Sequence, residues 1–462
     1  MPSPARDPAA AGMGAGPGPP RENRVYLAFI GSSLIVALGA GFAFAVVLPL
    51  SMAGLIPWEE RVPLMLQAHG WAQLQGWAGL FVAGMSVRLV PLFSGRPALR
   101  GAFSLPVLGL LVFSVVTRSV VEPFIDGQAG EALVVVAGFA GAVGMVAIAG
   151  ALAFTLARAR RRRDSWYCFA WAGTAWWAAW GALTAIAAIR AGGNGRLTPV
   201  LFDDTLTWIA ILGAIGNIIW GVQSRSVPIF FGRKSPRVRR VLIPGLLLNL
   251  GVLALLLSLL PLRDPVSERL AGLGLLLAGA GSCWLAPLAG APWGRPTRLR
   301  PRSKSAARYV IAANLAAMAG GLLLAWAGLH TILAGEFAAV GVRDAARHLF
   351  GVGLITMLAL GMARLITPIF ALERAEPGPA GAVAHLEWGS LAAAVVLRAG
   401  TGLLSGHMNN DARLELAGIA GALAWLGVAA FAFSVARALW KEPRMKALLA
   451  SAAGVGPPVR DE

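Results

Sequence analysis

Apolar residues run through this chain in twelve long stretches, separated by short connections that hold most of the charged and turn-forming residues. A helix needs about 20 apolar residues to cross the hydrocarbon core of a bilayer, and each stretch is long enough. The stretches predict spans at about 26–52, 64–93, 101–122, 130–157, 165–190, 204–231, 238–262, 267–289, 307–331, 341–371, 382–406 and 413–439. The pattern therefore predicts an all-α polytopic membrane protein with twelve transmembrane helices.

One segment of the chain occurs three times. Its copies surround Pro91, Pro228 and Pro368, which are 137 and 140 residues apart. When the copies are aligned on these prolines, the matched positions are Gly76, Gly213 and Gly353; Gly84, Gly221 and Gly361; Phe93, Phe230 and Phe370; and, twenty positions before each proline, Trp71, Trp208 and His348. We interpret the twelve spans as three pseudo-repeats of four, with this motif helix second in each repeat.

The repeats define the predicted domain organisation. A membrane domain of residues 25–440 divides into units of about 25–158, 165–290 and 306–440. Residues 1–24 are rich in Pro, Gly and Ala and predict a disordered tail, and residues 441–462 form a second tail. Because equivalent helices of a repeated fold occupy equivalent places, spans 2, 6 and 10 are expected to line the centre. Their glycines either permit close helix packing or leave room for a flat cofactor.

Charge alternates between the connections. Basic runs at 158–163, 233–240 and 295–308 follow even-numbered spans, whereas acidic residues such as Glu59, Glu60 and Asp203 follow odd-numbered ones. By the positive-inside rule, the basic connections and both termini are expected on the cytoplasmic side of the cell's inner membrane. The formal net charge of +18 then reflects contacts with anionic membrane lipids, and nucleic acid is not an expected partner.

Two histidines suggest a cofactor. His69 and His348 each lie about five residues, or about 8 Å, inside the outer end of a motif helix. Neutral imidazole is a good axial ligand for haem iron, so this pair could hold a haem between spans 2 and 10. The alternative for each is a buried histidine bonded to a neighbouring carbonyl group. His330 and His407 close spans at the outer surface, as further ligands or as exposed histidines.

Arginines accompany these histidines on the outer side, where positive charge is disfavoured. They are Arg118, Arg343, Arg347 and Arg398. A charged group inside a span normally has a partner, and haem propionates suit a guanidinium group because the two can form paired hydrogen bonds. The alternative partners are protein carboxylates such as Glu122 and Asp344, or lipid headgroups. Arg398 is the strongest propionate candidate because apolar residues flank it.

Several segments resemble the NnrS family of membrane proteins. They are AGMSVRLVPLFSGRPALRG at 83–101, GVQSRSVPIFF at 221–231 and RHLFGVGLITMLALGMAR at 347–364. The resemblance implies a twelve-span inner-membrane protein with haem and copper, linked to nitric-oxide metabolism, denitrification and nitrosative stress. It also implies similarity to the catalytic subunit of haem-copper oxidases, whose low-spin haem is ligated by histidines of spans 2 and 10.

The chain departs from the family pattern in ways that bear on metal content. His69 is followed by Trp71 where relatives often have His-x-His, and span 6 carries Trp208 with no histidine. A copper centre on spans 6 and 7 is therefore not expected. The leading hypothesis is one haem b held by His69 and His348, with Arg118, Arg347 and Arg398 near its propionates. We expect a role in sensing or handling nitric oxide or electrons, alongside respiratory proteins.

Two other functions remain open at the level of the sequence. One is a cofactor-free small-molecule permease or a membrane scaffold for a respiratory complex. The other is an active reductase, which would require a second metal site. No complete catalytic constellation is visible in the chain, and we do not expect an enzyme.

Overall fold

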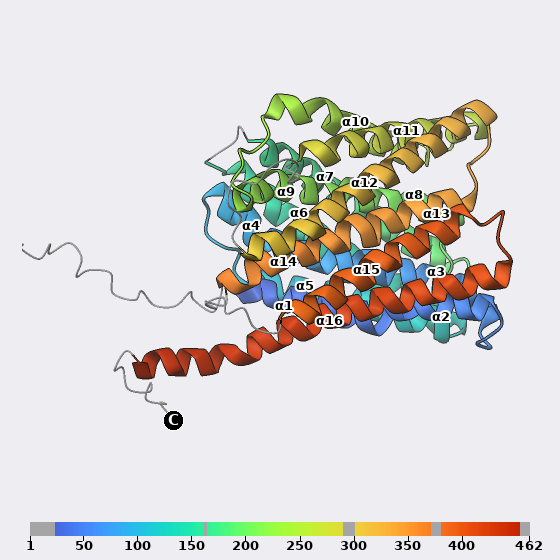
Figure 1. Ribbon diagram of the computed structural model, residues 1–462. Coiled ribbons are helices and arrows are strands. Elements are labelled where there is room, and N and C mark those ends of the chain that lie inside the picture. The colour runs from blue at the N-terminus through green and yellow to red at the C-terminus, as the bar shows by residue number, and fades with distance from the viewer. Residues whose placement is uncertain (1–23, 161–163, 290–300, 371–379, 453–462) are drawn as a thin grey trace, which may run out of the picture.

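The computed structural model describes residues 24–160, 164–289, 301–370 and 380–452, with side chains described for 24–160, 164–289, 305–365 and 381–437. The predicted tail at 1–24 lies outside these residues except for its last position. The described chain is a bundle of long helices that run along a common axis, and it contains no strand (Figure 1). Eleven of the helices are long and apolar enough to cross a membrane.

The spans follow the predicted order. They are α1–η3–α2 (Val25–Val36, Ala37–Gly41, Phe42–Met52); η4–α3–η5–α4 (Glu59–Arg61, Val62–Trp71, Ala72–Gly79, Leu80–Ser94); α5 (Gly101–Phe124); α6 (Gly127–Ala157); α7 (Ser165–Gly192); α8–η6–α9 (Val200–Trp208, Ile209–Ile215, Gly216–Phe230); α10 (Val238–Leu257); α11 (Asp264–Leu288); α12 (Pro301–Ala334); α13–η7–α14 (Val340–His348, Leu349–Thr356, Met357–Phe370); α15 (Ala380–Leu403); and α16 (Asn410–Ala452).

The eleventh predicted span and the second tail differ in detail from the expectation. The predicted span at 382–406 corresponds to α15, a helix of 24 residues that is not among the eleven apolar ones. Glu387 and Arg398 lie within α15 and lower its hydropathy. Helix α16 continues to Ala452 and so includes the beginning of the region predicted as a tail at 441–462, the rest of which lies outside the described residues.

A π-helical segment interrupts each of the three motif helices at the same place. Segments η5, η6 and η7 begin directly after Trp71, Trp208 and His348, the residues that stand twenty positions before the motif prolines. A π-helical turn widens the helix by one residue and is frequent at functional sites. Its recurrence at the matched position in spans 2, 6 and 10 shows that the repeated sequence folds as a repeated structure.

These three motif helices form the centre of the bundle, as predicted. In their most apolar windows 78%, 89% and 72% of residues are buried, against 44–56% in the other eight apolar spans. Segment η5 contacts both η6 and η7. The Trp77 indole N–H of span 2 donates to the Thr356 hydroxyl of span 10 at 2.9 Å, and an edge-on ring contact joins Trp208 to Phe350.

The other helices pack around this centre with threefold pseudo-symmetry. Helix α6 packs on α7, α11 packs on α12, and α16 packs on α2, so that the last helix of each unit meets the first helix of the next. The contact between α16 and α2 closes the ring, and Figure 1 shows the red C-terminal helix beside the blue N-terminal one. The arrangement confirms twelve helices in three units of four.

The repeated glycines serve close packing. A Cβ atom at Gly76 would lie 2.4 Å from the Val36 side chain of the preceding span, and one at Gly84 would lie 2.6 Å from Phe29. The equivalent contacts are Gly213 with Trp176, Gly353 with Ala316, Gly221 with Phe169, and Gly361 with Tyr309. Neighbouring helices therefore already occupy the space beside these glycines, and of the two roles predicted for them the structure shows helix packing.

Candidate functional site

His69 lies near the end of α3, two residues before its last residue, Trp71, and the π-helical segment η5 follows directly. Its Nδ1 is 2.9 Å from the carbonyl oxygen of Gly41, the last residue of η3 in the first span. A carbonyl oxygen can only accept, so Nδ1 carries the proton in this bond. In the neutral imidazole the lone pair then resides on Nε2, the nitrogen available to a ligand.

His348 lies at the end of α13 and has a similar bond within its own helix. Its Nδ1 donates to the carbonyl oxygen of Asp344 at 2.9 Å and lies 3.3 Å from the Asp344 carboxylate. The other carboxylate oxygen of Asp344 is 2.7 Å from Nη1 of Arg398 on α15. Asp344 thus connects His348 of span 10 to Arg398 of span 11, and Nε2 of His348 again holds the lone pair.

Contacts between the first and third motif helices bring His69 to the same end of the bundle as His348, Asp344 and Arg398, and we call these four residues the histidine cluster. We refer to the end of the bundle that contains this cluster as the histidine end. The two histidines do not occupy matched positions in the repeat, because His348 aligns with Trp71 and His69 stands two positions earlier.

Arg118 is not part of this cluster. It is fully buried on α5, where its Nε donates to Glu122 at 3.0 Å and its guanidinium group lies 3.9 Å from the centre of the Trp71 ring. Arg118 and Arg398 nevertheless occupy equivalent positions in the repeat. Each stands three residues after a valine, Val115 or Val395, that packs beside a repeated glycine. The repeat places Trp71 with Arg118 in one unit and His348 with Arg398 in another.

Arg347 and Arg343 both bind Asp204, which belongs to span 6. Arg343 Nη1 is 2.6 Å from Asp204 Oδ2, and Arg347 forms an ion pair with Oδ1 while lying over the Trp208 ring. Asp204 was not among the partners predicted for these arginines, which were Asp344, Glu122 and lipid headgroups. The acidic pair at 203–204 gave a signal, because two carboxylates inside an apolar span require partners.

Each arginine predicted to face propionates therefore has a carboxylate of the protein itself as partner. The ion pairs are Arg118–Glu122, Arg347–Asp204 and Arg398–Asp344. The other histidines lie apart from the histidine cluster: His330 contacts the Trp326 ring at 5.5 Å, and His385 and His407 are exposed. Glu387, next to His385, binds Arg364 of the third motif helix.

The donor groups of the histidine cluster fit a haem with two protein ligands. Metal-bound histidines usually donate their second ring nitrogen to a carbonyl or carboxylate, and both His69 and His348 do so. A metal site with three or more protein ligands is not found. The part of the chain that the structure describes contains no group of three His, Cys, Asp or Glu residues able to hold a metal ion.

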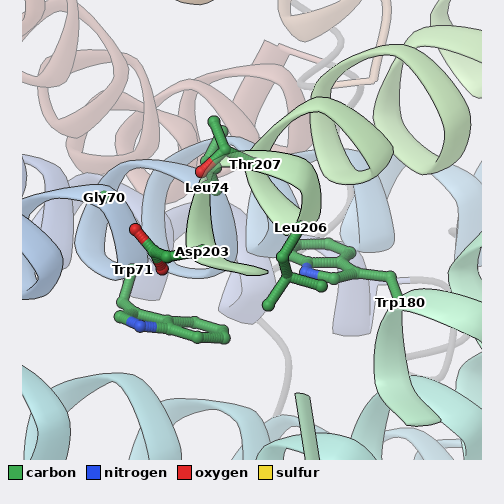
Figure 2. A pocket seen from close by; sticks show the side chains of 7 residues that line it. All are labelled: Gly70, Trp71, Leu74, Trp180, Asp203, Leu206 and Thr207. Atoms are coloured by element: carbon green, nitrogen blue, oxygen red, sulfur yellow. The ribbon is translucent and has the colours of Figure 1, made fainter. Parts of the chain in front are cut away.

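A separate small pocket lies between the first and second motif helices at the histidine end of the bundle. Its cavity volume is about 20 Å³, and its lining residues are Gly70, Trp71, Leu74, Trp180, Asp203, Leu206 and Thr207. Figure 2 shows the Asp203 carboxylate beside the Trp71 indole, with Leu206 and the Trp180 indole on the other side of the space. We call it the Asp203 pocket.

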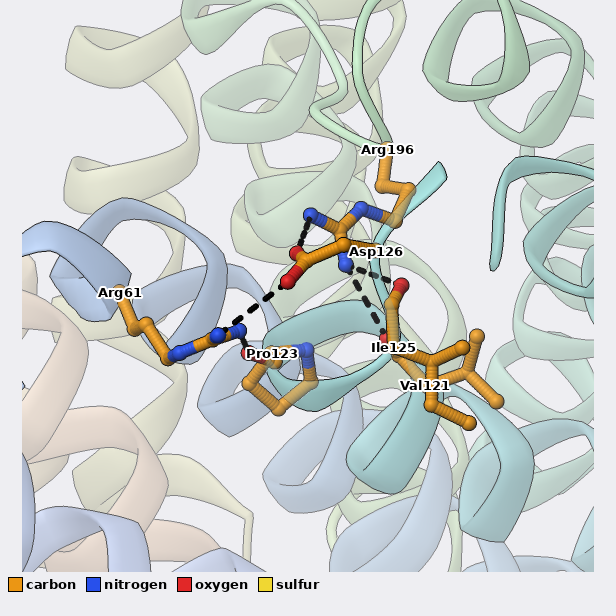
Figure 3. A network of polar contacts seen from close by, with 6 residues as sticks. All are labelled: Arg61, Val121, Pro123, Ile125, Asp126 and Arg196. Carbon is orange, nitrogen blue, oxygen red and sulfur yellow. Dashed lines mark hydrogen bonds and ion pairs between the residues drawn. The ribbon is translucent and has the colours of Figure 1, made fainter. Parts of the chain in front are cut away.

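A cluster of polar contacts joins the connections between spans 1 and 2, spans 3 and 4, and spans 5 and 6 (Figure 3). The Asp126 carboxylate accepts hydrogen bonds from Arg196 at 2.7 Å and from Arg61 at 3.2 Å. Arg61 also donates to the Pro123 carbonyl, and Arg196 to the Ile125 carbonyl, so both cations satisfy the C-terminal end of α5. The hydrogen bond from Arg196, and next the one from Arg61, hold the pKa of Asp126 below its usual value.

The fold defines an integral membrane protein of the all-α, multi-pass class. No model of a known protein family matches the chain, and a search of curated proteins found no match either. The functional conclusion therefore depends on the site residues themselves.

Proposed function

We propose that this protein is an NnrS-like membrane protein that binds one b-type haem at the histidine end of the bundle, with His69 and His348 as axial ligands. The observation that carries the proposal is the matched bonding of the two rings. Both direct Nδ1–H to a backbone carbonyl oxygen at 2.9 Å, which leaves Nε2 as the lone-pair nitrogen in each. The two rings come from spans 2 and 10, whose π-helical segments η5 and η7 are in contact, which supports placing both at one iron.

Each residue of the histidine cluster has a distinct part in this proposal. The Gly41 carbonyl fixes the tautomer and orientation of His69 from the first span, and the Asp344 carbonyl does the same for His348. The Asp344 carboxylate lies 3.3 Å from His348 Nδ1 and helps to hold that ring. Arg398 supplies a positive charge beside Asp344, and its bond to Asp344 holds it there.

When bound, a haem with two histidine ligands supplies a one-electron redox centre. Both axial positions would be filled by the protein, which favours electron handling or sensing over reduction of a bound gas. This is the reason to propose a role in nitric-oxide response or respiratory electron handling without an enzymatic turnover. We also propose that the basic connections and both termini face the cytoplasm, because the charge asymmetry between connections supports that orientation.

Haem content of the purified protein tests the proposal. We expect about one haem per chain in wild type expressed with a haem supply, and loss of most of it in His69→Ala and in His348→Ala. His330→Ala is the matched control, because His330 is also half-buried in a span but contacts Trp326 instead. A wild type that folds without haem, or two ligand variants that keep it, would overturn the proposal.

A second function is favoured by one specific observation. Arg118, Arg347 and Arg398 already have carboxylate partners, so no propionate is needed to satisfy their charges. A cofactor-free small-molecule permease, or a scaffold for a respiratory complex, is consistent with that. A colourless, monodisperse wild type from haem-supplied cells would select this class. Nitric-oxide consumption by a haem-loaded protein would instead select the reductase.

A further inference from the structure

The Asp203 pocket combines one carboxylate, one hydroxyl group and two indole rings. Asp203 and Thr207 come from α8 of the second unit, Trp71 from α3 of the first, and Trp180 from α7 (Figure 2). Trp71 and Trp180 are 5% and 1% exposed, so their rings form rigid walls. The cavity volume is about 20 Å³, which is room for about one water-sized molecule. A ligand here is therefore about the size of a water molecule.

Asp203 differs sharply from its neighbour Asp204. Asp204 binds two arginines, Arg343 and Arg347, whereas among the described residues none donates a hydrogen bond to the Asp203 carboxylate. Asp203 interacts with Glu122, Arg118 and Arg347 only through longer-range electrostatics. A carboxylate without a bonded partner inside an apolar span is costly, and such a residue commonly marks a binding site.

The Thr207 hydroxyl is a second oxygen atom that can accept a hydrogen bond in the pocket. It lies one helical turn after Asp203 and on the same face of α8, because residues four apart on a helix are neighbours. Thr205, in the same helix, donates its hydroxyl to a backbone carbonyl, but the described contacts include no such bond for Thr207. The pocket thus offers acceptor oxygens from two adjacent side chains.

We propose that this pocket binds an ammonium ion. The cation donates hydrogen bonds to the Asp203 carboxylate and the Thr207 hydroxyl, and the indole rings of Trp71 and Trp180 beside them stabilise its charge.

Alkali and alkaline-earth cations fit the pocket poorly. Hard cations such as Ca²⁺ take about six to eight oxygen ligands, and Mg²⁺ about six. The side chains that line this pocket supply oxygens from Asp203 and Thr207 only, and its remaining surface is aromatic, aliphatic or glycine.

Calorimetric titration of ammonium chloride into the purified, detergent-solubilised protein tests the assignment. We expect saturable ammonium binding in wild type that Na⁺ or K⁺ at equal concentration does not displace. Asp203→Asn keeps the side-chain shape but removes the charge, and should weaken binding at least about tenfold. Thr207→Val should weaken it about threefold, as expected for a neutral hydrogen bond. Asp411→Asn, at an exposed carboxylate on α16, is the matched control and should bind as wild type.

Three results would overturn the assignment: no saturable binding in wild type, wild-type affinity in a folded Asp203→Asn protein, or equal displacement by Na⁺ or K⁺. If Asp203→Asn does not elute as a monodisperse protein, the competition series in wild type and the Thr207→Val variant decide the question. Haem content is measured separately, so failure of this proposal and failure of haem binding are distinguishable.

Discussion

His69 and His348 each direct Nδ1 to a backbone carbonyl oxygen 2.9 Å away, and the two carbonyl groups come from different parts of the fold. Gly41, the partner of His69, ends a π-helical segment of the first span, whereas Asp344, the partner of His348, lies one turn earlier in the same helix. Two imidazoles from repeat-related helices are thus oriented independently and hold their lone pairs on Nε2. Metal-bound histidines usually donate their second ring nitrogen in this way.

The carboxylate of Asp344 leads to a prediction about the proposed haem. Asp344→Asn keeps the backbone carbonyl that orients His348 but removes a negative charge next to the ring and releases Arg398. Loss of negative charge destabilises the more positive oxidised iron, so the reduction potential should rise. A redox titration of the variant beside Asp411→Asn measures the shift. An unchanged or lower potential would show that Asp344 does not act on the haem.

The packed glycines predict a sharp contrast between two alanine variants. In Gly76→Ala the new Cβ would lie 2.4 Å from Val36 and 3.0 Å from Val115, so two helices must separate. We expect a loss of about 1–3 kcal/mol and a lower thermal midpoint. Gly150→Ala is the control, because a Cβ there meets nothing within 4 Å and alanine favours a helix. Fluorescence-detected thermal unfolding in detergent compares the two; equal midpoints would contradict the packing role.

The Asp126 cluster predicts a specific pH dependence. Because hydrogen bonds from Arg196 and Arg61 lower the pKa of Asp126 in the folded protein, its stabilising effect is complete above the ordinary carboxyl pKa of about 4. The effect is lost as the pH falls through the lowered value. The difference in thermal midpoint between wild type and Asp126→Asn should be constant from about pH 8 to pH 5 and vanish in stronger acid. A difference that shrinks between pH 8 and pH 6 would contradict this.

Arg364 of the third motif helix forms a buried ion pair with Glu387 of α15, and the stability effects of substituting the two residues should depend on each other. Arg364 binds both carboxylate oxygens of Glu387, and the Glu387 side chain is 0% exposed. Arg364→Met leaves that carboxylate without its cation and should cost about 3–5 kcal/mol. Adding Glu387→Met should recover most of the loss, because two apolar side chains need no pairing. Thermal midpoints of the single and double variants measure the coupling, and purely additive effects would argue against a buried pair.

The architecture was predictable because its signals are local. Long apolar stretches locate spans, and the aligned residues around Pro91, Pro228 and Pro368 identify the three units and their central helices. The structure confirms both, including the packing role of Gly76 and its counterparts. The π-helical turns left no such signal. They depend on how the three motif helices meet at the centre of the bundle, which no single stretch of sequence contains.

The charged partners show where sequence reasoning fails. Arg118 and Glu122 are four residues apart on one helix, so their ion pair could be anticipated. The pairing of Arg343 with Asp204 could not, because 139 residues separate them and only the contact between units 2 and 3 joins them. For the same reason the sequence does not show that Asp203, in the first turn of α8, lines a pocket shared with Trp71 of the first unit.

The most direct test of the central claim is the low-temperature electron paramagnetic resonance spectrum of the oxidised, haem-supplied protein. The account predicts a six-coordinate, low-spin ferric signal in wild type, and conversion to high-spin or haem-free protein in both His69→Ala and His348→Ala. The His330→Ala control should keep the low-spin signal. A folded wild type without any haem signal, or a low-spin signal that survives removal of either histidine, would contradict it.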